Sequence, residues 1–323
     1  FSRSYALIVF DKEKVESTLR KYLDSSVNFI LQVGGYILDG GGKRVRPYLV
    51  LKFASMLRGY NKEEDYILAS ALEYLHTASL LHDDVVDGSE KRRGKPTANR
   101  VFGNDTTVLV GDYMYANALY LFSIYGDIDM IKNVSDSVKK MAEGQLLELK
   151  KIADFDTSFD DYYKIVLGKT AVLFGSCCYV GTALVSDDKD LKENAYQYGI
   201  NLGVAFQIID DILDYEGDEE KVGKSLMNDL KEGKITYPLL VVKDLLNQED
   251  KDFIKSVILD KNPSVESLLK AKKIVEDYGG IEKAKADAES YVRKAIENLK
   301  NFPDNKDKQD LIDLAHYIVK RES

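Results

Sequence analysis

Two clusters of aspartates are the residues in this chain whose type and spacing could do chemistry. The first lies in residues 80–93, LLHDDVVDGSEKRR, at the end of an apolar stretch. On a helix, Asp83 and Asp87 lie one turn apart on the same face, with Asp84 on its flank. Carboxylates this close repel one another and stay ionised around cations, and hard oxygen ligands suit Mg²⁺ bound with water and phosphates. A lone DDxxD pattern, however, is more often a solvated helix end.

A second copy of the pattern changes this interpretation. Asp210, Asp211 and Asp214 in AFQIIDDILDY repeat the spacing at the end of another apolar run. Aspartates on an ordinary surface would rarely follow Phe206 and Ile209 so closely. Two matched acidic helix ends predict two helices that face each other across a cavity and hold several Mg²⁺ ions between them.

Basic residues offer a partner for such a metal site. In residues 40–47, GGGKRVRP, glycines allow close approach of the backbone, and a helix N-terminus offers free N–H groups to an anion. Lys43 and Arg46 are three residues apart, so both can point at one phosphate group. Alone, this segment would be interpreted as a surface loop. Beside two carboxylate clusters, a diphosphate site is the better interpretation.

Further candidate anion ligands flank both clusters. His76 lies two helical turns before Asp83 on the same face. A histidine among leucines is more often a core residue, and only this alignment favours a phosphate ligand. Arg92 and Arg93 follow the first cluster closely enough to clamp phosphate oxygens. A second basic set accompanies the second cluster and consists of Lys169, Lys224 and Lys234. The glycine-rich segment that carries the last two is typical of a lid that a bound anion draws in.

Length and composition limit the alternatives. With 323 residues the chain could form one or two domains, and the two clusters must converge on one site, so we expect a single domain over residues 1–323. Hydrophobic residues at 45% and charged residues at 31% describe a soluble globular chain. No run approaches the roughly 18 apolar residues of a transmembrane segment. The net charge of −9 argues against nucleic acid as a partner.

The cysteines and the first residues bear on location. Cys177 and Cys178 are adjacent in an apolar helical run, and we expect reduced core residues in a reducing compartment such as the cytoplasm. The chain begins with Phe1, and residues 1–11 are interpreted as a processed or cloning-derived tail. FSRSYALIV also fits the end of a mitochondrial presequence, which would place the protein in the mitochondrial matrix.

Helical patterns position all these residues, and no alternating run competes as a strand. The C-terminal third carries no motif, so we expect it to act as scaffold and dimer support. Small residues at Gly168, Ala171 and Gly203 could either line a tunnel or let helices pack closely. The expected helices cover residues 12–38, 47–58, 63–87, 106–125, 127–151, 159–185, 189–216, 235–246, 249–259, 265–277, 280–300 and 307–321.

The motifs together resemble those of the trans-prenyl diphosphate synthases. GGGKRVRP, LLHDDVVDGSEKRRG, GKTA and FQIIDDILD with the downstream GK…GK appear in order between residues 35 and 240, without a departure at any motif position. The whole chain looks most like the long-chain, octaprenyl-type branch. The resemblance implies an all-α, single-domain helical bundle of the isoprenoid-synthase type around a deep central cavity. It also implies a homodimer that contacts membranes only peripherally, for product release.

The activity implied by the resemblance is a Mg²⁺-dependent prenyl transfer. Such enzymes condense isopentenyl diphosphate repeatedly with an allylic diphosphate and release diphosphate. The implied product is an all-trans polyprenyl diphosphate of about 30 to 50 carbons, about 40 favoured, of the kind found as a quinone side chain. Three Mg²⁺ ions per active site would be the cofactor.

Carried over residue by residue, the resemblance implies two diphosphate pockets. Isopentenyl diphosphate would be held by Lys43, Arg46, His76 and Arg93. The Mg²⁺ ions under the allylic diphosphate would be held by Asp83, Asp87 and Asp210, supported by Asp84, Asp211 and Asp214. The allylic diphosphate itself would contact Arg92, Lys169, Lys224 and Lys234, with Thr170 and Gln207 nearby.

The physical chemistry of this reaction agrees with these residue types. Breaking the allylic C–O bond creates a carbocation and a diphosphate leaving group, whose charge cations stabilise. The carbocation needs dipoles, which the Thr170 hydroxyl and the Gln207 carbonyl can supply. The proton then leaves to the departing diphosphate, and water must be excluded because it would trap the cation.

Product length depends on the residues below the first cluster. In the family, a length gauge lies four and five residues before the first aspartate, where aromatic residues stop chains early. Here these positions are Ser79 and Ala78, both small. On a helical wheel Ser79 lies about 40° from Asp83 and Ala78 about 140° away, so Ala78 is assigned by resemblance alone. The candidates for a deeper floor, chosen by spacing and bulk, are Tyr115, Leu119 and Phe122.

Other functions remain open at this point. The first is a short-chain synthase making products of 15 or 20 carbons. A terpene cyclase also ionises a diphosphate on Mg²⁺, but it needs only one diphosphate site. A subunit of a heteromeric synthase could dispense with one cluster, and a phosphate-binding regulatory module would need neither.

Overall fold

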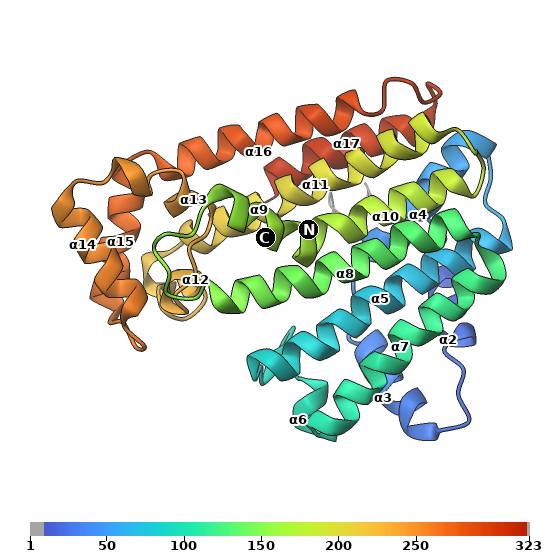
Figure 1. Cartoon of the computed structure of the whole chain (residues 1–323), viewed down its shortest axis with the longest axis horizontal. Coiled ribbons are helices and arrows are strands. Elements are labelled where there is room, and N and C mark those ends of the chain that lie inside the picture. Colours follow the sequence, from blue (N-terminus) through green and yellow to red (C-terminus); the bar gives the residue numbers. More distant parts are fainter. Residues whose placement is uncertain (1–9, 322–323) are drawn as a thin grey trace. The chain divides into compact units, whose positions relative to one another are not determined.

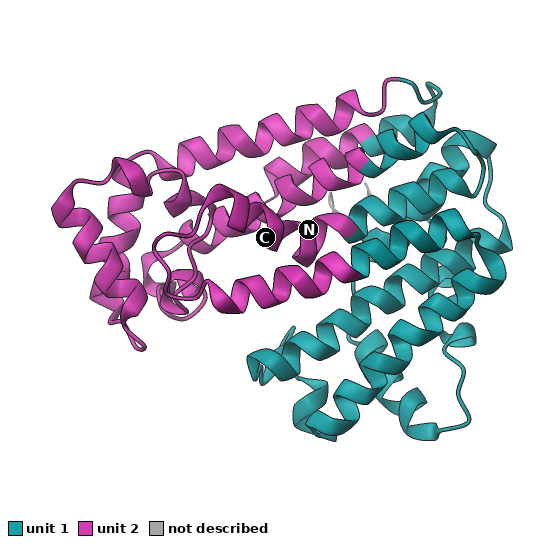
Figure 2. Cartoon of the chain, in the orientation of Figure 1, with its two compact units in different colours: residues 1–138, 173–196, 301–311 teal, residues 139–172, 197–300, 312–323 magenta. Residues whose placement is uncertain are grey.

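The computed structural model describes residues 10–321, and the fold is all-α as the sequence predicts. Its one sheet within this range is a minimal antiparallel pair of β1 (Lys91–Arg92) and β2 (Lys95–Pro96), in which Lys91 lies opposite Pro96 (Figure 1). The chain divides into two compact units, each assembled from several segments (Figure 2). Unit 1 comprises residues 1–138, 173–196 and 301–311, and unit 2 comprises residues 139–172, 197–300 and 312–323.

Unit 1 is organised around α5 (Glu63–Asp87) and α7 (Asn104–Tyr125), which pack against each other along their lengths (Figure 1). α5 is buried over most of its surface, and Tyr74 in its middle donates its hydroxyl to the Leu19 carbonyl at 2.5 Å. The helix ends at Gly88, whose positive φ of 63° a glycine adopts without strain. The other elements that lie wholly in unit 1 are α2 (Lys12–Tyr22), α3 (Asn28–Asp39), α4 (Val45–Arg58), α6 (Ala98–Phe102), β1 and β2.

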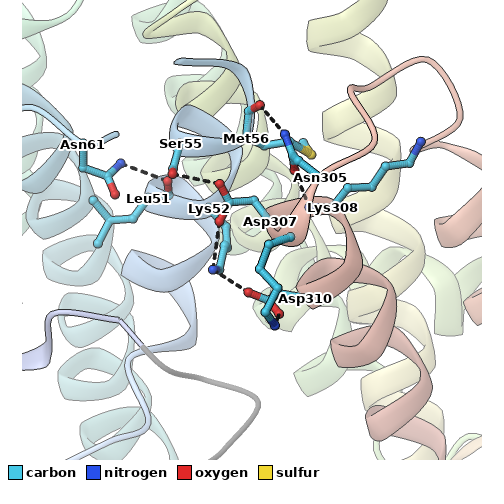
Figure 3. A network of polar contacts seen from close by, with 10 residues as sticks. Leu51, Lys52, Ser55, Met56, Asn61, Asn305, Asp307, Lys308 and Asp310 are labelled. Atoms are coloured by element: carbon cyan, nitrogen blue, oxygen red, sulfur yellow. Dashed lines mark hydrogen bonds and ion pairs between the residues drawn. The ribbon is translucent and has the colours of Figure 1, made fainter. Parts of the chain in front are cut away.

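A polar network fixes the start of α17 (Lys306–Lys320) on α4 within unit 1 (Figure 3). Lys52 Nζ donates to Asp307 Oδ1 at 3.0 Å and to Asp310 Oδ2 at 2.7 Å. Ser55 Oγ donates to Asp307 Oδ2 at 2.8 Å, and Asn305 Nδ2 donates to the Met56 carbonyl at 3.0 Å. Because these groups are largely shielded from water, their pairing anchors α17 firmly.

Unit 2 contains the second aspartate cluster and the C-terminal helices. Four helices contribute residues to both units: α17, α8 (Ile128–Lys150), α10 (Val172–Ala183) and α11 (Lys189–Tyr215). The elements wholly in unit 2 are α9 (Phe159–Val166), η1 (Leu167–Ala171), η2 (Glu219–Lys221), α12 (Asn228–Lys231), α13 (Tyr237–Leu240), η3 (Lys243–Leu245), α14 (Gln248–Leu259), α15 (Val265–Asp277) and α16 (Gly280–Glu297).

Two of the helices predicted from the sequence are not continuous in the structure, so these two predictions are wrong. The helix predicted at residues 12–38 is interrupted after α2, where Ser25 Oγ accepts from the Val27 N–H and so competes with helical hydrogen bonding. The helix predicted at residues 235–246 is reduced to α13 and η3. The run predicted at 159–185 is helical, but η1 within it is a π-helical turn.

Two further expectations concern membrane-spanning segments and the N-terminal residues. By length and composition the helical run Phe159–Ala183 could cross a membrane, although the sequence suggested no such stretch; 78% of its most apolar window is buried, as in a core helix. Within the tail expected at residues 1–11, Phe10 packs on Tyr48 and Asp11 caps α2, so both belong to the fold. The presequence interpretation of residues 1–9 lies outside the described residues.

Candidate active site

The first acidic cluster occupies the last turn of α5, in unit 1. Asp83 is half-buried, Asp87 is exposed, and Asp84 is only 2% exposed. Asp84 accepts two hydrogen bonds from one guanidinium, from Arg92 Nη2 at 2.7 Å and from Arg92 Nε at 3.2 Å. Arg92, expected on a diphosphate, is therefore engaged by Asp84, and this pairing makes Asp84 a supporting residue.

α7 fixes the end of α5 beside this cluster. His82 Nε2 lies 3.0 Å from the Val108 carbonyl and 3.2 Å from Asp112 Oδ1. The helices can approach because Gly111 has no side chain: a Cβ there would lie 2.5 Å from the His82 ring. Tyr115 packs on His82, with ring centroids 5.4 Å apart, and its pKa is raised by burial and by Asp83. Tyr115 thus lies beside the last turn of α5.

The two chain-length candidates occupy different environments on α5. Ala78 is fully buried, and its carbonyl would lie 3.4 Å from a Cβ on Gly111, so this residue belongs to the contact with α7. Ser79 is half-buried, and its hydroxyl donates to the His76 carbonyl at 2.6 Å. Only Ser79 therefore reaches an open surface of unit 1. Of the other two candidates for a floor, Leu119 is 38% exposed and Phe122 is fully buried.

Arg44 holds the basic segment in place, a role the sequence did not reveal. It adopts a positive φ of 54°, which turns its side chain inward from the start of α4. Its Nε donates to Glu16 at 2.6 Å, its Nη1 to Glu73 at 3.2 Å and its Nη2 to the Leu38 carbonyl at 2.9 Å. No local signal distinguishes this arginine from Lys43 and Arg46, because its carboxylate partners, Glu16 and Glu73, are distant in the chain.

The glycine turn and the segment after α5 meet in unit 1. A Cβ on Gly42 would lie 3.4 Å from Arg93 Nη1 and 3.6 Å from Arg44 Nη1. Gly41 and Gly42 both have positive φ, of 83° and 156°, which lets the backbone pass close to these guanidinium groups. Lys43, on the same turn, is exposed. Arg93 therefore lies beside the glycine turn that carries Lys43.

His76 marks the centre of the positive charge. Burial lowers the pKa of its imidazole well below the ordinary value, and neighbouring cations lower it further, so the ring is neutral at pH 7. The cations that act on it are Arg46, Arg92, Arg93 and Arg44. The Arg46 guanidinium lies over the Phe174 ring, 4.9 Å from its centroid, and its buried Nε has no hydrogen-bond partner among the described residues. Such an arrangement suits an incoming anion.

The second acidic cluster ends α11, in unit 2, and Asp211 is its most enclosed member. It is 3% exposed and accepts hydrogen bonds from the Tyr162 hydroxyl at 2.5 Å, Gln207 Nε2 at 3.0 Å and the Tyr237 N–H at 3.3 Å. Burial and the nearby Asp229 raise the pKa of the Asp211 carboxyl to about 7, although the hydrogen bonds from Tyr162 and Gln207 oppose this shift.

Asp214 orders the segment that follows the cluster. Its carboxylate accepts from the backbone N–H groups of Asn228 at 3.0 Å and Asp229 at 3.2 Å, at the start of α12. Burial and Asp229 raise the pKa of the Asp214 carboxyl to about 7. Residues 217–236, expected as an open lid, are instead folded on unit 2 through buried Leu226 and Leu230. Asp229 is a further acidic residue beside the second aspartate cluster, and no sequence motif indicated it.

Asp210 has a partner that the sequence did not suggest. Arg321, which directly follows α17, donates from Nη2 to Asp210 Oδ1 at 2.5 Å and to the Phe206 carbonyl at 2.8 Å. The Asp210 side chain is 39% exposed, whereas that of Arg321 is 8% exposed. Asp210 is therefore more exposed than the buried Asp211.

Lys169 and Thr170 lie in the π-helical turn η1, a local irregularity that often marks functional sites. The Thr170 hydroxyl donates to Gln207 Oε1 at 3.3 Å. Lys169 Nζ and Lys234 Nζ each lie 3.7 Å from the carboxylate of Glu148, so the structure brings these two lysines together. Lys224 is exposed, and no contact in the described part of the chain joins its ammonium group to them.

Close packing holds η1 between α8 and α11. A Cβ on Gly168 would lie 2.5 Å from the Lys140 carbonyl, and one on Gly203 would lie 2.6 Å from Ala171 Cα. Both distances are far below van der Waals contact, so only glycine fits. These small residues therefore serve close helix packing, one of the two interpretations that the sequence left open.

The donor set suits a hard divalent cation. Within residues 10–321 no three His, Cys, Asp or Glu side chains form a ready-made metal centre in one place. Both clusters nevertheless offer only carboxylate oxygens, which Mg²⁺ prefers. The raised pKa values of Asp211 and Asp214 indicate buried negative charge that hydrogen bonds do not fully compensate, and a cation would compensate it.

Comparisons with known proteins agree with these features. Residues 27–276 match the family model for polyprenyl synthetase. The octaprenyl diphosphate synthase of Escherichia coli (strain K12) is 38% identical over 314 residues, covering 97% of this chain and 96% of that protein. A solved decaprenyl diphosphate synthase from Rhodobacter capsulatus is 35% identical with a TM-score of 0.91, covering 97% and 96% of the two chains. A polyprenyl synthase from Caulobacter crescentus CB15, complexed with calcium and isoprenyl diphosphate, is 33% identical with a TM-score of 0.87, covering 97% and 95%.

An all-α fold with these motifs and relatives defines a class of enzyme. The chain belongs to the polyprenyl synthetase family. It is a prenyltransferase of the trans-polyprenyl diphosphate synthase type, and the polyprenyl synthase family uses isoprenyl diphosphate substrates.

Proposed function

We propose that this prenyltransferase is a Mg²⁺-dependent long-chain synthase. It adds isopentenyl diphosphate repeatedly to an allylic diphosphate until the all-trans product has about 40 carbons. The observation that carries the proposal is the small size of Ser79, half-buried one turn before Asp83, where a bulky residue would block a growing chain. The octaprenyl and decaprenyl synthases among its relatives support the same length class.

The residues of unit 1 serve isopentenyl diphosphate in this proposal. Arg93 lies beside the glycine turn that carries Lys43, and the ion pair of Arg44 with Glu73 fixes the start of α4 there. Neutral His76 can donate one hydrogen bond to a phosphate oxygen without adding charge. Arg46 supplies a guanidinium whose Nε has no hydrogen-bond partner within residues 10–321.

The residues of unit 2 serve the allylic diphosphate. Asp210 here, and Asp83 and Asp87 in unit 1, are the proposed Mg²⁺ ligands, and bound Mg²⁺ would stabilise the charge that develops on the leaving diphosphate. Lys169 and Lys234 hold the same group, with Glu148 keeping the two ammonium groups in place. Thr170 and Gln207 present dipoles to the carbocation, and their hydrogen bond restricts both side chains.

The proposal includes a homodimer in the cytoplasm. Leu109, Tyr120 and Ile124 fall on one face of α7 and are 65%, 63% and 51% exposed, which is typical of an interface. Light scattering on the purified protein would show a mass of two chains. Cys177 and Cys178 are both buried, unbridged thiols, in line with a reducing compartment.

One experiment tests the function. The enzyme is supplied with isopentenyl diphosphate, farnesyl diphosphate and Mg²⁺, and the dephosphorylated products are separated by chromatography. We expect products near 40 carbons and none when EDTA replaces Mg²⁺. Products that stop at 15 or 20 carbons would favour the short-chain alternative, and cyclic products would indicate a terpene cyclase.

A further inference from the structure

The contact between Arg321 and Asp210 is a built site, not a surface ion pair. The guanidinium of Arg321 stacks on the Phe206 ring, with Cζ 3.9 Å from the centroid, and its side chain is 8% exposed. Nη2 bridges Asp210 Oδ1 and the Phe206 carbonyl. A buried guanidinium held by a ring and two oxygens has a defined position.

This guanidinium retains unused hydrogen-bonding capacity. Its Nε is buried and has no hydrogen-bond partner among the described residues. An unsatisfied donor of a buried cation is costly, so an additional acceptor at this place would be favourable. The acceptor would have to be an anion or a carbonyl close to Asp210.

We infer that Arg321 couples metal binding to diphosphate binding at Asp210. The inference rests on the proposed function, which places Mg²⁺ on this carboxylate. Arg321 Nη2 competes with a divalent cation for Asp210 Oδ1, and its positive charge repels the metal. A diphosphate that binds together with the metal removes this competition. Its oxygens accept hydrogen bonds from the Arg321 guanidinium, which leaves Asp210 Oδ1 free to bind the metal.

Coupling of this kind has a defined thermodynamic form. If diphosphate increases the affinity for the metal by some factor, the metal increases the affinity for diphosphate by the same factor. Removing the guanidinium should strengthen binding of the metal alone and weaken binding of the metal with diphosphate. The two opposite changes both reduce the coupling factor, whereas simple structural damage would weaken both kinds of binding.

The test uses calorimetry with Mn²⁺ and inorganic pyrophosphate on the full chain. Pyrophosphate affinity is measured with and without saturating Mn²⁺, and Mn²⁺ affinity is measured alone. We expect Arg321→Gln to reduce the coupling factor about tenfold, within the usual range for linked sites, while Mn²⁺ alone binds more tightly. Lys320→Gln removes an exposed neighbouring cation and should leave all three affinities unchanged.

The outcomes separate this inference from the proposed function. Equal coupling factors in Arg321→Gln and the wild type would overturn the inference alone. A wild type that binds no pyrophosphate with Mn²⁺ would overturn the proposed function and the inference together. If the glutamine variant does not fold, Arg321→Lys keeps the charge but loses the planar stack on Phe206, and its coupling factor should fall by a smaller amount.

Discussion

The Thr170 hydroxyl donates to Gln207 Oε1, which fixes the amide so that Gln207 Nε2 points at Asp211. Gln207→Glu would replace this donor by a second carboxylate. Because like charges disfavour ionisation, the pKa of Asp211, already about 7, should rise further. We expect the acidic limb of the kcat/KM profile to move upward by about one pH unit.

Thr170→Val is the matched control for this prediction. It removes the hydroxyl that contacts Gln207 but leaves the Gln207–Asp211 hydrogen bond possible. It should lower kcat and leave the acidic limb in place. An acidic limb that moves equally in both variants would show that Asp211 does not set it.

The outer carboxylates should matter for turnover. Asp83→Ala and Asp210→Ala each remove a proposed metal ligand at a partly exposed position. We expect kcat/KM to fall by about 100-fold or more in both variants, with a Tm close to that of the wild type for Asp83→Ala and a lower Tm for Asp210→Ala, which leaves the buried Arg321 guanidinium without this carboxylate. Asp105→Ala, at an exposed position in the first turn of α7, is the control. Near-normal condensation by either variant at ordinary Mg²⁺ would contradict the metal assignment.

Part of this site was predictable from sequence because its residues are neighbours along the chain. The two aspartate clusters and the Lys43–Arg46 pair can be recognised in the sequence from their helical spacing. Arg44 and Arg321 do not, because Arg44 acts through an unusual φ and Arg321 meets Asp210 only in the folded chain. The interruption of the expected N-terminal helix before Val27 was likewise not predictable from sequence. Nor was the π-helical turn, which depends on packing at Gly168.

The aspartates of the second cluster also predict how stability depends on pH. In the folded chain the pKa of Asp214 is about 7, whereas an unfolded aspartate titrates near 3.9. Between about pH 4 and pH 7 the folded state therefore binds more protons at this site, so its contribution to the free energy of unfolding falls as pH rises. The side chain introduced by Asp214→Asn cannot lose a proton, so the free energy of unfolding of this variant should lack this decrease.

The difference in Tm between Asp214→Asn and the wild type isolates the effect. Measured without metal, the Tm of the variant relative to that of the wild type should increase from pH 5 to pH 8. His76, whose pKa is lowered by burial, contributes a slope of opposite sign below about pH 6.5 in both proteins and cancels in the difference. A difference that stays constant with pH would mean that Asp214 is ionised throughout.

The two diphosphate pockets can be separated by kinetics. Lys43 lies exposed on the glycine turn of unit 1, and Lys234 contacts Glu148 in unit 2. Lys43→Ala should raise mainly the KM for isopentenyl diphosphate, by about tenfold for one lost charge-assisted contact. Lys234→Ala should raise mainly the KM for the allylic substrate. If both variants raised the same KM alone, this division of the pockets would be wrong.

Product length provides the last prediction, and the structure separates the two gauge positions. Ser79 is half-buried, so Ser79→Phe can place its ring in the space below Asp83. An aromatic ring there should shorten the products, because the packed helices around it cannot yield. We expect products of about 15 to 20 carbons at near-normal initial condensation rates, seen by chromatography after dephosphorylation.

Ala78→Phe should behave differently because Ala78 is fully buried against α7 near Gly111. Overpacking this contact should cost about 1–3 kcal/mol of stability in addition to any change in product length. Ala78→Ser adds little volume and should keep both the product length and the Tm, which makes it the control for the position. Wild-type-length products from Ser79→Phe, in a folded and active enzyme, would show that the chain does not grow past this face of α5, and the length gauge would have to be sought elsewhere.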